Sequence, residues 1–492
     1  MNVLLISPKH PATFWSFKYA LRFVGRRTAF PPLGLLTVAA LLPKEWRLRL
    51  VDLNVRPLRR RDLEWASLAL ISAMTVQRAS AREALQRCRE AGVRTVAGGP
   101  LFTCEPEHFP EADHLVLNEA EVTLPRFLAD LAAGSPQRVY TSAEFPDIRS
   151  TPAPRWDLAN LRHYASMSVQ YSRGCPFNCD FCSVTALFGH RPRTKTPAQV
   201  IAELDLLWAR GWRGNVFFVD DNLLGNKAAL KRELLPALIE WQRRHGLPFN
   251  TEASINLADD EKLMAMMVRA GFDTVFVGIE TSDEASLSEC GKEQNRHRDL
   301  VADVRRMQRA GLQVQGGFIV GFDHDTAETF QKQIDFIQAS GIPTAMVGLL
   351  EAVPGTRLYD RLKREKRLSE TDSTGDNADG RTNIITRMNT EALRDGYRRL
   401  MQHLYAPRQY YRRVRTLLRE YRTPHVRMSV SIPRLLALGR STVHLGVVGR
   451  ERFHYWRLML WTSLHRPRLL PTAVTLSIYG HHFRRMSQEH LR

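Results

Sequence analysis

Three cysteines lie close together near the middle of the chain: Cys175, Cys179 and Cys182. Their spacing, C-x3-C-x2-C, directly follows residues 168–172, which are predicted to form a strand. Three thiolates on one tight loop can ligate three irons of a cubane and leave the fourth iron open to a non-protein ligand. The pattern therefore predicts a [4Fe-4S] cluster with one free coordination position.

A structural zinc site is the competing interpretation of these cysteines. Such a site needs a fourth Cys or His ligand, and no second C-x2-C occurs in the sequence. The other three cysteines, Cys88, Cys104 and Cys290, are scattered and are interpreted as ordinary thiols. Six cysteines in 492 residues do not make a disulfide framework, so the usage indicates a reducing, cytoplasmic compartment.

A series of six βα units positions the cysteine loop. The strands are expected at 168–172, 216–220, 249–255, 274–278, 313–320 and 344–350, with helical patterns such as 197–210, 228–244 and 327–339 between them. Six sequential units without a dinucleotide-binding glycine fingerprint predict a complete or partial barrel over residues 168–368. Its chemistry is then expected at the carboxyl ends of the strands.

The first part of the chain, residues 1–144, predicts a separate α/β domain. Short apolar runs at 3–7, 48–53, 68–73, 95–98 and 114–117 alternate with helical patterns at 33–42, 79–91 and 122–133. This order is typical of a doubly wound, Rossmann-like sheet, in which ligands sit at the carboxyl ends of the strands. The loops there are rich in Gly and Pro, at 30–34 and 98–100. Residues 145–167 contain three prolines and are expected to be a linker.

The C-terminal part of the chain carries most of the positive charge. Residues 369–383 are polar and predict a mobile loop, and residues 384–492 predict a mostly helical region. Between 401 and 492 there are 17 arginines, no lysine and three acids, a net charge of +14 against +19 for the whole chain. Such a block favours an anionic partner, either lipid, nucleic acid or an acidic protein, unless it is simply a solvated helical face.

The motifs together resemble those of a known enzyme family. The cysteine loop with Phe181 beside its last cysteine resembles the radical S-adenosylmethionine (SAM) superfamily. The strand-end segments 218–222, 278–281, 316–322 and 354–356 resemble those of cobalamin-type members, and 30–34, 98–100 and 118–121 resemble their cobalamin-binding domain. Nearly the whole chain, including 13–17 and the arginine-rich end, resembles a bacterial branch that contains hopanoid C-2 methylases.

The resemblance implies three cofactors: the [4Fe-4S] cluster, SAM and cobalamin. A polar residue that ends a barrel strand faces the site, although such residues also serve as helix caps or bond within loops. The cofactor-binding residues implied are Phe181, Asp221, Asn222, Ser254, Asn256 and Glu280 for SAM, and Pro32, Gly34, Gly98, Gly99 and Glu119 for cobalamin. The motif D-x-H-x-x-G is absent, and neither His10 nor His114 has its context, so cobalamin is expected to lack a histidine lower ligand.

The implied reaction is methyl transfer to an unactivated carbon of a hydrophobic small molecule or lipid, with SAM as the source of the radical and cobalamin as the methyl donor. The alternatives are C–C coupling or cyclisation with the same cofactors, or modification of RNA by a methylthiotransferase-like enzyme. The tail lacks the short alternating strands of an RNA module, so no nucleic acid is expected. A non-enzymatic iron–sulfur module does not account for a full barrel.

Further partners follow from the chemistry and from the tail. The implied reaction needs an electron donor such as flavodoxin or ferredoxin. The longest late stretch without formal charge, 469–483, is too short to span a membrane and contains a proline. Arginines interleaved with Tyr455, Trp456, Trp461, Tyr479 and Phe483 suggest peripheral contact with the anionic inner face of a membrane, or else a lid packed on the barrel.

Overall fold

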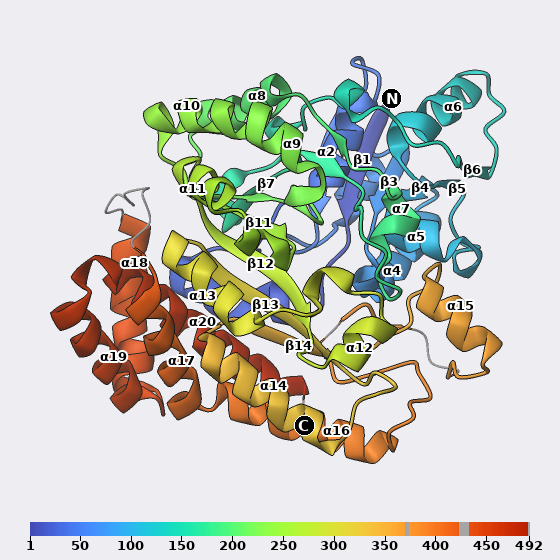
Figure 1. Ribbon diagram of the computed structural model, residues 1–492. Helices are drawn as coiled ribbons and strands as arrows, with labels where there is room; N and C mark the ends of the chain where they lie inside the picture. The colour runs from blue at the N-terminus through green and yellow to red at the C-terminus, as the bar shows by residue number, and fades with distance from the viewer. Residues whose placement is uncertain (370–372, 377, 423–431, 491–492) are drawn as a thin grey trace.

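The computed structural model describes residues 1–369, 373–376, 378–422 and 432–490, and contains two parallel six-stranded sheets (Figure 1). The first sheet has the order β2-β1-β3-β4-β5-β6. Because β1 pairs with both β2 and β3, the strand order reverses there, which is where doubly wound sheets bind ligands. The predicted N-terminal α/β domain is confirmed, with a two-residue sixth strand added. The strands are β1 (Asn2–Ser7), β2 (Arg47–Asp52), β3 (Leu68–Ser72), β4 (Arg94–Gly98), β5 (His114–Val116) and β6 (Val139–Tyr140).

Helices cover both faces of this sheet, and the strands between them are almost fully buried. Continuous apolar runs such as Val3–Ile6 are what a parallel strand covered on both faces requires. The helices of this part are α1 (Lys18–Val24), α2 (Leu33–Leu41), α3 (Arg60–Trp65), α4 (Arg78–Glu90), α5 (Pro100–Cys104) and α6 (Ala120–Ala132).

The second sheet follows the chain in order, β14-β13-β12-β11-β10-β7, and forms a partial barrel that is open between β7 and β14. The six predicted βα units are confirmed. Its strands are β7 (Ser166–Val169), β10 (Asn215–Phe218), β11 (Phe249–Ala253), β12 (Phe272–Glu280), β13 (Gln313–Val320) and β14 (Ala345–Leu349), with a short hairpin of β8 (Ser172–Arg173) and β9 (Arg193–Thr194) after β7.

Several barrel helices begin at side-chain caps. The α8 helix starts at Thr196, whose hydroxyl accepts from Gln199 N in a capping box, and α13 starts at Asp299, whose carboxylate accepts from Ala302 N. The helices are α7 (Val184–Phe188), α8 (Pro197–Ala209), α9 (Lys227–Ala229), α10 (Leu235–His245), α11 (Glu261–Arg269), α12 (Glu284–Glu289), α13 (Leu300–Ala310), α14 (Ala327–Ser340) and α15 (Arg357–Arg364), and a π-turn (Leu230–Leu234) joins α9 to α10.

The C-terminal region is helical, as predicted, and packs on the barrel beside β14 (Figure 1). The Tyr405 hydroxyl donates to Ala345 O at 2.6 Å and the Tyr397 hydroxyl to Val347 O at 3.0 Å, so both bond the backbone of the barrel's last strand. The elements are α16 (Thr390–Tyr405), α17 (Pro407–Glu420), α18 (Ile432–Ser441), the π-helix η11 (Thr442–Val448), α19 (Arg452–His465) and α20 (Leu470–His490).

The N-terminal segment helps to close the open side of the barrel. Phe14 stacks on Phe483 of α20 with ring centroids 4.0 Å apart, and Trp15 Nε1 lies 2.9 Å from the Met346 sulfur on β14. On the opposite edge, Ser166 N of β7 donates to Ala29 O at 2.9 Å. The three predicted parts of the chain therefore share one barrel core.

The tail aromatics do not form a membrane face as a group. Tyr455 is 1% exposed and Phe483 0%, while Trp461 and Tyr479 are half-buried against the core. Trp456 alone of the five is exposed, at 49%. For Tyr455 and Phe483 the expectation of lipid contact is wrong, because both fill the interface between the tail helices and the rest of the protein.

Candidate active site

The cysteine loop runs from β8 to α7 and is tied down by its own backbone. Gly174, at φ +93°, precedes the first cysteine, and a Cβ there would lie 2.9 Å from Arg191 O and 3.0 Å from Gly189 O, so the turn requires glycine. Cys175 N donates to Gly189 O and Cys182 N to Cys179 O, each at 3.2 Å. The sequence motif therefore forms one compact loop against the β8–β9 hairpin.

The three thiols are free, partly exposed and close to amide side chains. Asn222 Nδ2 lies 3.9 Å from Cys175 Sγ, and Gln294 Nε2 lies 3.8 Å from Cys179 Sγ. In the described ranges, no three His, Cys, Asp or Glu side chains converge to hold a single metal ion. Thiolates that each ligate a different iron of a cubane need no such convergence, so this arrangement is compatible with a cluster on the loop.

A buried aspartate that sequence analysis did not single out anchors the start of this loop. Asp220, at the end of β10, accepts hydrogen bonds from the Tyr171 and Ser172 amides and from the Ser172 hydroxyl. Burial raises the pKa of Asp220 to about 6. Its carboxylate thus fixes the chain just before the cysteines.

Polar side chains at the ends of β10 and β11 form a row beside Cys175. The Ser254 hydroxyl lies 2.6 Å from Asn256 Oδ1 and 3.4 Å from Asn222 Oδ1. Asp221 precedes Asn222, and burial raises its pKa to about 6. The structure therefore brings together four of the residues implied as SAM ligands, although Asn222 also caps the turn that follows it, accepting from Leu224 N.

Glu280 ends β12 on the other side of the cysteine loop, in the left-handed region at φ +63°. Its carboxylate accepts from Lys292 Nζ at 2.6 Å, and the same ammonium lies 5.9 Å from the Phe181 ring centroid. A Cβ on Gly278 would lie 2.5 Å from Glu280 Oε1, so a larger residue there would displace the Glu280 carboxylate from this position. Glu280 and Phe181 thus meet around Lys292, a residue without any local signal in the sequence.

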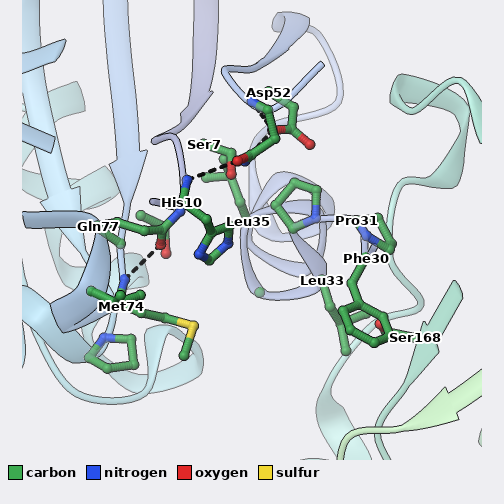
Figure 2. A pocket seen from close by; sticks show the side chains of 18 of the residues that line it. Ser7, His10, Phe30, Pro31, Leu33, Leu35, Asp52, Met74, Gln77 and Ser168 are labelled. Carbon is green, nitrogen blue, oxygen red and sulfur yellow. Dashed lines mark hydrogen bonds between the residues drawn. The ribbon is translucent and has the colours of Figure 1, made fainter. Parts of the chain in front are cut away.

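A cavity of about 1420 Å³ lies between the two sheets (Figure 2). The loops at the carboxyl ends of β1, β3, β4 and β5 line one side, and β7, β10 and β11 line the other. This volume exceeds that of typical ligand pockets, about 300–1,000 Å³, and suits a ligand as large as a corrin. Every residue implied for cobalamin lines it: Pro32, Gly34, Gly98, Gly99 and Glu119.

Two of these glycines allow the backbone a close approach. A Cβ on Gly98 would lie 2.6 Å from Val116 O, and a Cβ on Gly99, at φ +92°, would lie 2.8 Å from Ser72 Oγ. Any larger residue would force the loop after β4 away from its neighbours. The wall of the cavity therefore depends on glycine at both positions.

Glu119 is engaged by the barrel. Its carboxylate contacts Arg173 Nη1 and Arg193 Nη2, each at 2.6 Å, and Arg173 Nη2 also reaches Glu121 at 2.9 Å. All four side chains are largely buried. These ion pairs, which sequence analysis missed, join the first domain to the β8–β9 hairpin on either side of the cysteine loop.

The described part of the predicted loop 369–383 closes another side of the cavity. Gly375 and Asp376 line it, and Arg78 Nη1 donates to Ser373 O at 3.1 Å. Ser373 is buried and its hydroxyl donates to Glu351 at 2.7 Å. Residues 370–372 and 377 lie outside the described residues. Ser373 and Gly375 contact the first domain, whereas Thr382 and Asn383 bond the backbone that follows β14.

The barrel side of the cavity is mainly apolar, with one unpaired acid. Phe217, Val219 and Met346 line it with Trp15, and Glu252 of β11 points into the same space. Burial, with the nearby charges of Asp221 and Asp220, raises the pKa of Glu252 to about 8. Among the described residues no hydrogen bond to its carboxyl is found, so Glu252 faces the cavity in its neutral form near pH 7.

Glu252 should make the protein less stable as pH rises. A carboxyl whose folded pKa exceeds its unfolded value binds more protons when folded, so stability is lost between about pH 4.5 and 8. Glu252→Gln should therefore gain about 2–4 kcal/mol over wild type at pH 8.5 but less than about 1 kcal/mol at pH 5. Anaerobic denaturation at both values measures this. Glu328→Gln, at an exposed position, is the control, and equal gains at both values would contradict the assignment.

Comparison with known proteins assigns the successive parts of the chain to known families. Residues 24–128 match the B12 binding domain, residues 169–337 the Radical SAM superfamily and residues 356–492 a Domain of unknown function (DUF4070). The chain is 40% identical over 490 residues to Uncharacterized methyltransferase sll1242 of Synechocystis sp., covering 98% of this chain and 91% of that protein. It is 34% identical over 479 residues to Hopanoid C-2 methylase of Rhodopseudomonas palustris, covering 93% and 89%.

The chain belongs to the B12-dependent radical SAM methyltransferases. A solved structure has the same fold: the cobalamin-dependent SAM radical enzyme OxsB, with aqua-cobalamin and SAM bound, covers 100% of this chain and 84% of its own at a TM-score of 0.63 and 14% identity. The predicted family and cofactor set are thereby confirmed.

The residues present fit the cofactors of this methyltransferase family. The three thiols share one loop, and burial raises the pKa of Cys182 to about 12, so its thiolate becomes the stable form only when metal binds. The large cavity with its glycine-lined loops suits the corrin. His10 also lines the cavity, as Figure 2 shows, and burial lowers its pKa. Cobalamin without a histidine lower ligand stays a prediction.

Proposed function

We propose that this protein transfers a methyl group to an unactivated carbon of a hydrophobic small molecule or lipid. The observation that carries the proposal is one continuous cavity, which joins the glycine-lined loops of the first domain to the apolar mouth of the barrel. An unactivated carbon offers no acidic hydrogen to a general base, so radical chemistry is needed. The relative named Hopanoid C-2 methylase supports a lipid as the substrate class.

The residues around the cavity divide into three groups. Cys175, Cys179 and Cys182 would hold the cluster. When bound, the cluster and SAM supply a radical and cobalamin supplies the methyl group. The residues proposed to bind the organic cofactors are Phe181, Asp221, Asn222, Ser254, Asn256 and Glu280 for SAM, and Pro32, Gly34, Gly98, Gly99 and Glu119 for cobalamin.

The protein itself would position the substrate and exclude water from it. Phe217, Val219 and Met346 would hold an apolar substrate over the barrel mouth and exclude water from the reacting carbon. Lys292 holds the Glu280 carboxylate in place, and Asp220 holds the backbone before the cysteines. Neutral Glu252 would add no charge of its own to the barrel mouth.

The family uses a small-molecule substrate and a reductant. We propose that flavodoxin or ferredoxin is the electron donor. We also propose that this protein is cytoplasmic and contacts the anionic inner face of a membrane. No helix of the described residues is long and apolar enough to span a membrane.

Mass spectrometry of lipid and pigment extracts from a deletion strain tests the proposal. Replacement of H by CH₃ adds one CH₂, so the deletion strain should lose a species and accumulate one lighter by CH₂. The wild-type gene should restore the species, and a gene with alanine at the three cluster cysteines should not. Unchanged lipids and pigments, or a change confined to modified nucleosides of RNA, would disprove it.

A further inference from the structure

Exposed apolar side chains gather on one layer of the C-terminal region, formed by α18, η11 and α19. Of 17 large apolar side chains exposed in the described residues, ten lie in this layer, which occupies the outer edge of the molecule at the left of Figure 1. Such a patch on a folded protein marks an interaction site. The ten are Leu435, Leu436, Leu438, Val443, Val447, Val448, Phe453, Trp456, Leu460 and Leu464.

The α19 helix is apolar on two sides. Tyr455, Leu458 and Met459 are buried against the other tail helices. The exposed positions 453, 456, 460 and 464 follow the spacing of one helix face, and Phe453 is 73% and Leu464 71% exposed. One apolar face of α19 is thus covered by this protein and the other is presented outward.

The layer is also strongly basic. Arg450, Arg452 and Arg457 are exposed, as is Arg468 just after α19, and no ion pair in the described part of the chain engages them. The only acid between 432 and 468, Glu451, is buried and paired with Arg484 at 2.7 Å. An exposed apolar face flanked by unpaired arginines complements anionic head groups above an acyl layer.

The layer adjoins the cavity through α1. Arg440 Nη1, at the end of α18, donates to Arg22 O at 3.2 Å and to Phe23 O at 3.1 Å. Leu21 and Arg22 of the same helix line the cavity. A single helix therefore separates the apolar layer from the space proposed to hold substrate.

We propose that the α18–η11–α19 layer docks this protein on an anionic lipid bilayer, with α1 and the adjoining side of the cavity next to the lipid. The exposed apolar side chains and the arginines are sufficient to support the docking surface. Its role in delivering a hydrophobic substrate rests on the proposed function. Its members differ from the aromatics singled out from sequence, of which Trp456 alone belongs to it.

Co-sedimentation with vesicles tests the surface, with full-length protein at low salt. Wild type should bind phosphatidylglycerol–phosphatidylcholine vesicles and not phosphatidylcholine alone. A variant with Phe453→Ser, Leu460→Ser and Leu464→Ser keeps every charge and should bind at least about tenfold more weakly. The matched control, Leu206→Ser with Ile385→Ser, removes exposed apolar side chains elsewhere and should bind as wild type does. Circular dichroism checks that each variant folds.

Three results would overturn the proposal. The first is wild type that does not bind anionic vesicles, and the second is a triple variant that binds them as wild type does. The third is a wild-type dimer in lipid-free solution that is lost in the triple variant, because the layer would then be a contact between copies of this chain. Reductive SAM cleavage by the same preparations without vesicles is measured in parallel. Its loss in wild type would count against the proposed function, whereas intact cleavage without vesicle binding would count against docking alone.

Discussion

Replacing Cys175, Cys179 and Cys182 together by alanine should abolish both the iron–sulfur cluster and SAM cleavage. Anaerobically reconstituted wild type should bind about four irons and four sulfides, because three thiolates on one loop hold a cubane. The triple variant should bind only background iron and release no 5′-deoxyadenosine from SAM under reducing conditions. Iron and sulfide assays with chromatography of the reaction measure both.

The matched control replaces Cys88 and Cys104 by alanine. Both cysteines lie in the first domain, outside the cysteine loop. That variant should keep the cluster and its activity. Continued production of 5′-deoxyadenosine by the triple variant would contradict the assignment of the cluster to this loop.

Gly34→Leu should remove cobalamin while leaving the cluster in place. Gly34 lies in the first turn of α2 and lines the cavity, and a Cβ there would meet nothing within 4 Å. A leucine side chain can therefore enter the cavity without displacing backbone, and leucine favours the helix over glycine by about 0.5–1 kcal/mol. We expect at least about a fivefold loss of cobalamin retained through gel filtration, because overpacking a close-fitting site costs about 1–3 kcal/mol.

Gly439→Leu is the control, since Gly439 also lies in a helix with open space around its Cβ. It should retain cobalamin fully. Full retention of cobalamin by Gly34→Leu would show that the corrin does not occupy this part of the cavity. Loss of the cluster together with cobalamin would show that the variant is misfolded.

Much of this fold follows from patterns that are local in the sequence. Strands such as β3 and β14 are almost continuous apolar runs of ordinary length, and the cysteine loop is defined within eight residues. The two residues of β6 are too few to give any period. Local patterns thus predict the elements and the metal loop well.

What the sequence did not predict depends on contacts between distant segments. Arg173 meets Glu119 across 54 positions, and Gln294 meets Cys179 across 115, so no spacing points to either pair. In α19 apolar residues occur around the whole helix, and without a polar face nothing distinguishes buried Tyr455 from exposed Phe453.

The buried ion pairs between Glu119, Glu121, Arg173 and Arg193 bear on how ligands enter. A hinge motion that parted the two domains would have to break all three ion pairs together, because the four buried side chains lie on one interface. We therefore expect the two walls of the cavity to keep their spacing when ligands bind. Substrate and cofactors would then enter through openings at the edge of a preformed cavity. Any conformational change on entry would be confined to the segments around these openings.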